Sequence, residues 1–209
     1  MNQYTLRTWL VLAAAALLPV ILAVDAAASS KAEVEAKIKR GTLEVEGTKG
    51  EEEIALRLRA GDPAILEVVT TGGVLAFPRD QFTKIDVEAG HGDDLLRIDQ
   101  ANGGFTDTEA TTLDGEDDED DLRGGSGPET LVGGSGDDAA DGNVGADIGL
   151  LGRGDDSFTW DPGDGSDRVE GSRGDDTLVF NGAGGAENFD VSANGKRLRF
   201  FRNLGNIVM

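Results

Sequence analysis

Residues 115–179 read, in blocks of nine, GEDDEDDLR, GGSGPETLV, GGSGDDAAD, GNVGADIGL and LGRGDDSFT, then Trp160 and Asp161, then PGDGSDRVE and GSRGDDTLV. Glycine recurs at positions one, two and four of a block, aspartate at position six, and an apolar residue at position eight. A fixed period of this kind indicates one supersecondary unit stacked on copies of itself. The stretch therefore predicts a solenoid. The segments before and after it are expected to direct its export and to cap its two ends.

The charge of the chain is concentrated in this stretch. The net charge is -21, and residues 89–180 contain 25 acidic against 5 basic side chains and 20 of the 31 glycines. Low hydrophobicity with high like charge is typical of disorder unless a partner neutralises the charge. An acidic field repels nucleic acids and attracts cations, so no nucleic-acid partner is expected. Without cysteine, the chain has no disulfide framework and no thiolate metal site.

The block divides into a turn at positions one to six and a three-residue strand at positions seven to nine. Glycines let the turn adopt positive φ and approach an ion closely. Turn carbonyls and the position-six carboxylate are hard oxygen ligands, which calcium prefers, whereas zinc favours His or Cys ligands. Without the ion, the repelling charges predict a disordered chain, so metal binding would supply folding free energy.

Two blocks make one coil, so every second block stacks on the same side. This places three position-six aspartates, Asp120, Asp138 and Asp156, in one line that Asp176 continues. On the other side lie Glu129, Asp147 and, across the two-residue insertion, Asp167. The position-eight residues are expected to point inward as an apolar ladder of Leu122, Leu131, Phe158, Val169 and Leu178, which Ala140 and Gly149 weaken.

The blocks resemble the glycine-rich nonapeptide repeats of the repeats-in-toxin (RTX) family, also called hemolysin-type calcium-binding repeats, with consensus G-G-x-G-x-D-x-L-x. The good matches are GGSGDDAAD at 133–141, GSRGDDTLV at 171–179 and the outlying copy AGHGDDLLR at 89–97. The resemblance implies a parallel β-roll with several Ca²⁺ ions in its turns. It carries the family's ligand position to Asp94, Asp138, Asp147, Asp156, Asp167 and Asp176.

The predicted metal site therefore consists of position-six aspartates and turn glycines. It comprises Asp94, Asp120, Gly133, Gly134, Gly136, Asp138, Gly145, Asp147, Gly152, Gly154, Asp156, Gly163, Gly165, Asp167, Gly174 and Asp176. Two blocks depart from the pattern. Glu116 and Asp118 replace glycines, and Pro128 precedes the longer carboxylate of Glu129, which predicts weak binding there.

The N-terminus predicts export. Residues 1–26 have the Arg7 start, the apolar run 10–24 and the small residues of a cleaved secretory signal peptide. The alternative is a membrane-anchoring helix, but the run is shorter than the roughly 20 residues that a span needs. The mature protein is therefore expected to be secreted, with no stable membrane insertion, and to begin with a linker at 27–40.

The flanking segments complete an all-β prediction. Residues 41–88 alternate with period two between turn signals and predict about five short strands, a β cap over the open end of the solenoid. Residues 89–114 hold one good repeat and a degenerate stretch, 115–180 the calcium-binding roll, and 181–209 a capping hairpin around Asn194-Gly195. The ending Asn206-Ile-Val-Met209 suggests a truncated version of a longer chain.

The predicted function is calcium binding outside the cell in a structural or adhesive role, with self-association or cell-surface contact as candidate interactions. A periodic carboxylate array is a ligand ladder rather than one catalytic site, and the H-E-x-x-H and G-x-S-x-G motifs are absent. No enzyme activity is therefore expected. His91 is expected to be a solvated surface residue. The alternatives are a non-catalytic repeat fragment of a larger exported enzyme or adhesin, and an unrecognised enzyme in residues 41–88.

Overall fold

The computed structural model describes residues 33–184, 189–194, 197–202 and 207–208. Apart from the 3-10 turn η1 (Arg79–Gln81), its elements are β-strands, which confirms the all-β prediction. The expected signal peptide at 1–26 lies outside the described residues. Among those residues, no helix is long and apolar enough to cross a membrane.

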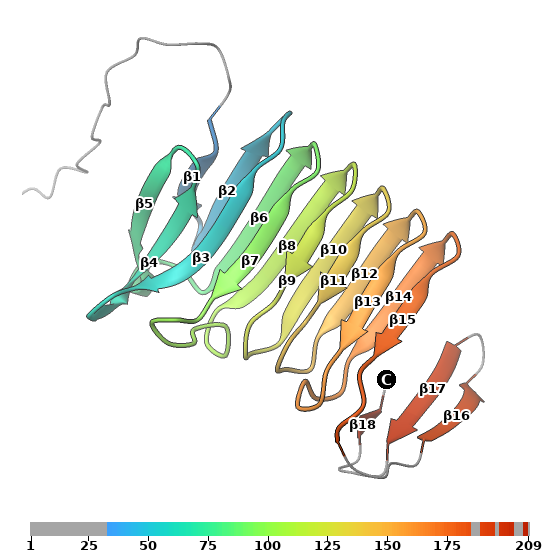
Figure 1. Ribbon diagram of the computed structural model, residues 1–209. Helices are drawn as coiled ribbons and strands as arrows, with labels where there is room; N and C mark the ends of the chain where they lie inside the picture. The colour runs from blue at the N-terminus through green and yellow to red at the C-terminus, as the bar shows by residue number, and fades with distance from the viewer. Residues whose placement is uncertain (1–32, 185–188, 195–196, 203–206, 209) are drawn as a thin grey trace, which may run out of the picture. The chain divides into compact units, whose positions relative to one another are not determined.

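Two large sheets contain most of the strands (Figure 1). The first sheet has the order β1 (Glu35–Lys39), β2 (Thr42–Thr48), β6 (Lys84–His91), β8 (Ala110–Asp117), β10 (Glu129–Ser135), β12 (Ile148–Arg153) and β14 (Arg168–Arg173). The second has the order β15 (Thr177–Phe180), β13 (Ser157–Trp160), β11 (Ala139–Asp141), β9 (Asp121–Arg123), β7 (Leu95–Asp99), β3 (Glu53–Arg59), β4 (Asp62–Thr70) and β5 (Gly73–Pro78).

The chain alternates between the sheets, and its register follows the nonapeptide. β10 pairs with β12 in parallel with Thr130 opposite Ile148, and β11 pairs with β13 with Ala139 opposite Ser157. In both pairs the partners lie two blocks apart in the sequence. After the insertion of Trp160 and Asp161, the separation increases by these two residues, as in the pairing of Ile148 with Arg168. The repeat length therefore sets which residues become neighbours.

The same parallel stacking extends further toward the N-terminus than the sequence indicated. β2 pairs in parallel with β6, with Leu43 opposite Ile85, and β3 pairs in parallel with β7, with Ile54 opposite Leu96. β6 and β7 pair in turn with β8 and β9, and their partners lie more than two blocks apart because extra chain near 100–109 is looped out. The copy at 89–97 is thus not detached. Nor are the five strands of residues 42–91 a separate cap, since three of them belong to the stack.

Antiparallel strands adjoin this stack, so both sheets are mixed. β3, β4 and β5 form an antiparallel meander, and β1 pairs antiparallel with β2. β1 corrects the predicted linker at 27–40. Its residues alternate between charged and apolar, and the Nζ of Lys37 lies 2.7 Å from the Oε1 of Glu46 on β2. Charged side chains are usual on an edge strand, where they oppose pairing with other chains.

The core lies between the two sheets. At position eight, Leu122, Leu131 and Phe158 are at most 1% exposed. The ring of Phe158 lies 3.0 Å from the place that a Cβ on Gly149 would take, so it fills the gap left by that glycine. The expectation is wrong for Leu178, which is 43% exposed because β15 is the last strand of its sheet.

Strand lengths also differ from the prediction. β9 and β11 have three residues, as expected, but β8, β10, β12 and β14 have six to eight. These longer strands run through positions one to three of the following block, since Gly134 still pairs with Gly152 and Ser135 with Arg153. Glycine at these positions is therefore compatible with strand as well as turn.

The C-terminal hairpin is present as β16 (Phe189–Asn194) and β17 (Arg197–Arg202), which pair antiparallel. A third strand, β18 (Ile207–Val208), pairs antiparallel with β17. The expected Asn194-Gly195 turn lies partly outside the described residues.

Candidate functional site

The position-six carboxylates lie in two rows, at the two edges where the chain passes between the sheets. The first row follows the strands of the first sheet and contains Asp94, Asp120, Asp138, Asp156 and Asp176. The second row follows the strands of the second sheet and contains Glu129, Asp147 and Asp167. The structure brings together the predicted position-six residues, in the order expected from the repeat.

One hydrogen bond repeats along the first row. The main-chain N–H of Asp120 donates to Oδ1 of Asp138 at 2.9 Å, and the N–H of Asp138 donates to Oδ1 of Asp156 at the same distance. The pattern continues to Asp176 at 3.2 Å and begins with the N–H of Glu52 donating to Oδ1 of Asp94 at 2.6 Å. Each carboxylate thus joins its own coil to the preceding one.

The second row repeats this bond. The N–H of Glu129 donates to Oδ1 of Asp147 at 2.7 Å, and the N–H of Asp147 donates to Oδ1 of Asp167 at 2.9 Å. Glu129 itself differs, because its longer side chain turns back so that Oε2 accepts the N–H of Gly125 in its own turn at 2.8 Å. Glu129 is therefore part of the row but is oriented differently from the aspartates.

The other oxygen of these carboxylates is buried without a partner. This holds for Oδ2 of six aspartates and Oε1 of the glutamate: Asp94, Asp120, Glu129, Asp138, Asp147, Asp156 and Asp167. All seven residues are at most 3% exposed. A buried ionised carboxylate without a full set of partners is costly. A row of them, one per coil, is the arrangement that bound cations would satisfy.

Burial makes these groups poor acids. It raises the pKa of Asp138 and Asp120 to about 7 and that of Asp147 to about 8, more than the accepted N–H bonds lower it. It raises the pKa of Asp94 and Asp167 to about 6. Neighbouring carboxylates in the row add to the increase. A divalent cation would reverse the effect, because nearby positive charge favours the ionised form.

Glycines at position one make room for the carboxylates. A Cβ on Gly133 would lie well under 3.0 Å from both Oδ2 of Asp138 and the carbonyl oxygen of Leu151 in the next coil. A Cβ on Gly142 would lie 2.5 Å from Oδ2 of Asp147. At Gly133, a partnerless carboxylate oxygen and a main-chain carbonyl therefore both border the space that a side chain would fill. Carboxylate and carbonyl oxygens are the donors that calcium takes in proteins.

The remaining predicted glycines bring successive coils close together. At most of them a Cβ would lie under 3.0 Å from a carbonyl oxygen of the preceding coil: Gly134, Gly136, Gly145, Gly152, Gly154, Gly165 and Gly174. Gly163 has positive φ but no atom within 4 Å of a Cβ. Glu116 and Asp118, which replace the glycines equivalent to Gly134 and Gly136, have φ of 74° and 83°. The block at 115 therefore keeps the turn conformation with less suitable residues.

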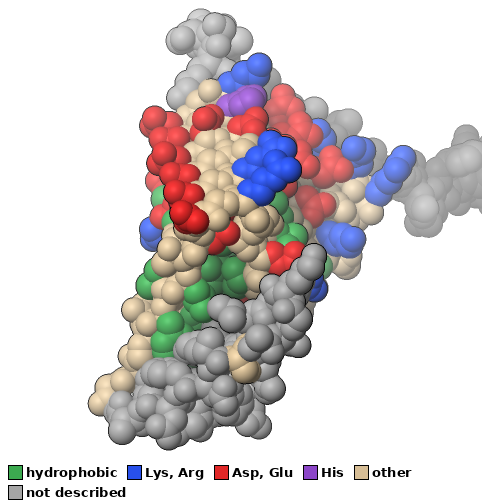
Figure 2. Space-filling view, turned by 90° about the vertical axis from the view of Figure 1, so that its right-hand side faces the viewer, with side chains coloured by type: hydrophobic (Ala, Val, Ile, Leu, Met, Phe, Trp, Pro, Cys, Tyr) green, Lys and Arg blue, Asp and Glu red, His purple; other side chains and the backbone are tan. Residues whose placement is uncertain are grey.

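The exposed face of the first row is also acidic. Asp137 and Asp155, at position five, are exposed, and the N–H of Asp155 donates to Oδ1 of Asp137 at 2.8 Å. Position five of the second row holds Pro128, Ala146 and Ser166 instead. Figure 2 shows acidic side chains gathered in a column on one side of the view. His91 belongs to this surface, with Nδ1 lying 3.1 Å from Oδ2 of Asp117.

One member of the first row was missed from sequence. Glu52 stands at the position equivalent to Asp94, because Glu53 pairs with Leu95. The signal was the block Gly47-Thr-Lys-Gly-Glu-Glu-Glu-Ile-Ala55, which has glycine at positions one and four and an acid at position six. It escaped detection because its acid is glutamate and because its distance from the next copy is not a multiple of nine.

Side chains alone do not form a metal cage here. No group of three or more His, Cys, Asp or Glu that could hold a metal ion is found within the described ranges. A cation in either row would need main-chain carbonyls to complete its shell, as the space beside Gly133 offers. Comparison with known proteins does not identify a relative: no family model, curated protein or solved structure matches the chain.

Proposed function

We propose that this chain is an exported calcium-binding protein of the repeats-in-toxin kind, in which Ca²⁺ held in the repeat turns drives folding of a parallel β-roll. Parallel pairing extends from β2 and β3 to β14 and β15, and the calcium-holding part of the roll would extend from β6 and β7 onward. Its role would be structural or adhesive rather than catalytic.

The observation that carries the proposal is the set of seven buried carboxylate oxygens without partners. They recur once per coil at equivalent places, so they have one common cause rather than seven local ones. Beside Asp138, Asp147 and Glu129, a glycine of the turn lies next to both the carboxylate and a main-chain carbonyl. Calcium takes six to eight oxygen ligands in flexible geometry, whereas magnesium demands a strict octahedron and keeps its waters.

The charge of the rows agrees with a divalent ion. Burial, and then repulsion between carboxylates of successive coils, raise the pKa of Asp120 and Asp138. Binding of Ca²⁺ would remove both penalties. Because the unfolded chain offers no assembled site, the binding free energy would become folding free energy.

The test compares two paired variants during a calcium titration followed by calorimetry and far-UV circular dichroism. Asp138→Asn with Asp156→Asn removes two buried ligands, and we expect the calcium concentration at the folding midpoint to rise by about tenfold or more. Asp137→Asn with Asp155→Asn removes the same charge from exposed neighbours and should shift the midpoint by about twofold at most, as expected for exposed charges.

Two outcomes would reject the proposal. One is a β spectrum that is complete in chelator and does not change up to about 10 mM calcium, a range that includes weak extracellular sites. The other is an equal effect of the two paired variants, since acidity alone, rather than ligation by position six, would then explain binding.

A further inference from the structure

We propose that residues 33–109 fold without calcium and serve as the template on which the calcium-dependent coils assemble. The inference rests on the proposed function and adds a division of labour within it. Its basis is that the first row begins with a glutamate whose carboxylate is satisfied by its own turn, and that a buried glutamate near the start of the second row is paired with an arginine.

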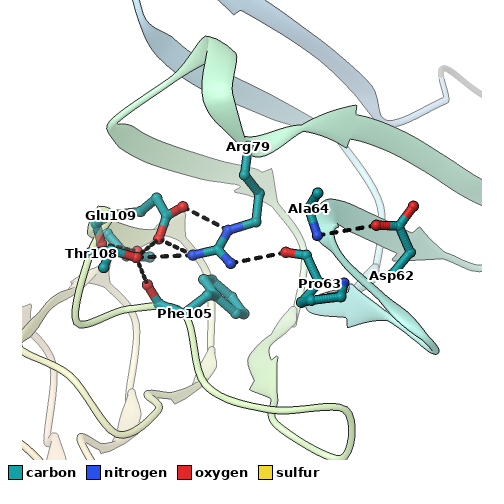
Figure 3. Close-up of polar contacts among 8 residues, drawn as sticks. Asp62, Pro63, Ala64, Arg79, Phe105, Thr108 and Glu109 are labelled. Atoms are coloured by element: carbon teal, nitrogen blue, oxygen red, sulfur yellow. Dashed lines mark hydrogen bonds and ion pairs between the residues drawn. The ribbon is translucent and has the colours of Figure 1, made fainter.

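Near the N-terminal end of the second row, Arg79 binds the buried carboxylate of Glu109 (Figure 3). Its Nε lies 2.7 Å from Oε1 of Glu109 and its Nη2 lies 2.8 Å from Oε2, a two-pronged ion pair. Nη2 also donates to Oγ1 of Thr108 at 2.9 Å, and Nη1 donates to the carbonyl oxygen of Pro63 at 3.0 Å. The guanidinium thus joins η1, β4 and the loop before β8. Such forked pairs are stronger and more specific than single contacts.

Glu109 is therefore a buried carboxylate whose charge is balanced by the guanidinium of Arg79. It is 5% exposed and directly precedes β8, two residues before Thr111, which pairs with Glu129 of the second row. Its oxygens are not among the partnerless ones, unlike Oε1 of Glu129 in the next coil. Thr106, in the same loop before β8, contacts the next turn of the second row, because its Oγ1 accepts the N–H of Gly127 at 3.0 Å.

The first row ends at Glu52, which is satisfied by its own turn. Oε1 accepts the hydroxyl of Thr48 at 2.6 Å, and Oε2 accepts the N–H of Thr48 at 3.1 Å. Thr48 occupies the position that Gly134 has in a later coil, so a hydroxyl-bearing residue has taken the place of a glycine. Within residues 33–109, Asp94 alone has a buried carboxylate oxygen without a partner, and its main-chain N–H donates to Oδ1 of Asp120 in the next coil.

Apolar burial shows the same division. Fifteen of the 22 buried apolar residues lie in residues 33–109, and only seven lie in residues 110–180, a stretch of similar length. Each group includes two buried aromatic residues, Phe82 and Phe105 in the first and Phe158 and Trp160 in the second. The first group also has the meander of β3, β4 and β5, which needs no turn ligand. Burial of apolar area is the main favourable contribution to folding. The first part has enough of it without an ion.

Charge acts in the same direction. Residues 33–109 contain 17 acidic and 9 basic side chains, whereas residues 110–180 contain 20 acidic and 4 basic. Self-repulsion of the second part is therefore larger, while its core is smaller. Once β6 and β7 are formed, they offer two parallel edges for β8 and β9, so each calcium-loaded coil would have an existing neighbour on which to fold.

Hydrogen–deuterium exchange of the full chain at pH 7.5, in EDTA and in 10 mM calcium, tests the inference. In EDTA we expect amides of β2 to β4 and β6 to exchange about 100-fold or more slowly than free peptide, while those of β10 to β13 exchange at nearly the free rate. In calcium both sets should be protected. This pattern supports the template and the calcium-driven roll together.

The alternative patterns separate the two proposals. Free exchange throughout in EDTA, with protection throughout in calcium, overturns the template and leaves calcium-driven folding intact. Equal protection of both sets in EDTA and in calcium overturns calcium-driven folding itself.

Two variants test whether the ion pair between Arg79 and Glu109 stabilises the calcium-independent part. Arg79→Met leaves Glu109 buried without its partner and should reduce protection of β4 and β6 in EDTA by about tenfold or more. Adding Glu109→Gln to Arg79→Met should restore at least part of it, because the buried charge is gone. Arg97→Met is the control, since its contact with Glu53 is exposed. Equal losses in Arg79→Met and Arg97→Met overturn the role of Arg79.

Discussion

Acidification should replace calcium in part, because protons and calcium relieve the same buried charges. In the folded coils the pKa is about 6 for Asp94 and Asp167, about 7 for Asp120 and Asp138, and about 8 for Asp147, against an ordinary value of 3.8. Between pH 4 and pH 8 the folded chain therefore binds more protons than the unfolded chain. Its calcium-free stability is highest near pH 4 and falls as the pH rises through 6 to 8.

The magnitude follows from these values. Between pH 8 and pH 5, the five groups together contribute about 12 kcal/mol if their shifts are taken in full. Water at the mouths of the turns screens part of this, so we expect roughly 5 to 10 kcal/mol. That is comparable with the whole stability of a small domain. It is enough to convert largely unfolded coils into folded ones without calcium.

The assay is far-UV circular dichroism with tryptophan fluorescence, recorded from pH 8 to pH 5 in calcium-free buffer containing EDTA. The β signal should increase on acidification, and Trp160, which is buried and stacked on Phe180 at 4.5 Å between ring centroids, should become shielded. Asp138→Asn with Asp147→Asn should remove about half of the pH dependence. A β signal that falls or stays constant between pH 8 and pH 5 would refute the reasoning.

Two further substitutions test the turns. Gly133→Ala places a methyl group against Oδ2 of Asp138. The calcium concentration at the folding midpoint, measured by circular dichroism, should therefore rise about tenfold, which corresponds to a loss of roughly 1.4 kcal/mol of binding free energy. Gly184→Ala, with nothing within 4 Å of the added Cβ, is the control, and an equal shift in both variants would contradict the site. Glu116→Gly relieves a left-handed φ of 74° and should raise the free energy of unfolding in calcium, measured by urea denaturation, by about 1 kcal/mol. A lower free energy of unfolding in the variant would show that the turn is not strained.

The regular part of the molecule could be predicted because its register is a property of the repeat. Once two blocks make a coil, Asp138 must lie between Asp120 and Asp156, and the hydrogen bonds between them follow. The inward side of the strands was equally readable, except at the end of the second sheet. There the exposure of Leu178 depends on the place of β15 as the edge strand of its sheet, which no local pattern encodes.

The N-terminal part was harder to predict because its coils are separated by irregular distances. These unequal spacings conceal that Glu52, Asp94 and Asp120 are consecutive members of one row. The strand β1 was not predicted, because five residues that alternate between charged and apolar are a weak strand signal by themselves. The neighbouring strand β2, which carries the Glu46 partner of Lys37, is needed to identify it. In both cases the missing information was the pairing between distant segments.

The sequence by itself determined the all-β class, the two-block coil and the two lines of acidic residues, because glycine spacing and period-two alternation act locally and repeat. Only the tertiary structure decided which carboxylate oxygens lack a partner and which have one. Asp138 and Glu109 are both buried acids, yet one has an oxygen without a partner and the other holds Arg79, a residue distant in the sequence. That difference depends on long-range packing, since burial and the approach of distant groups set the electrostatic free energy of a charge.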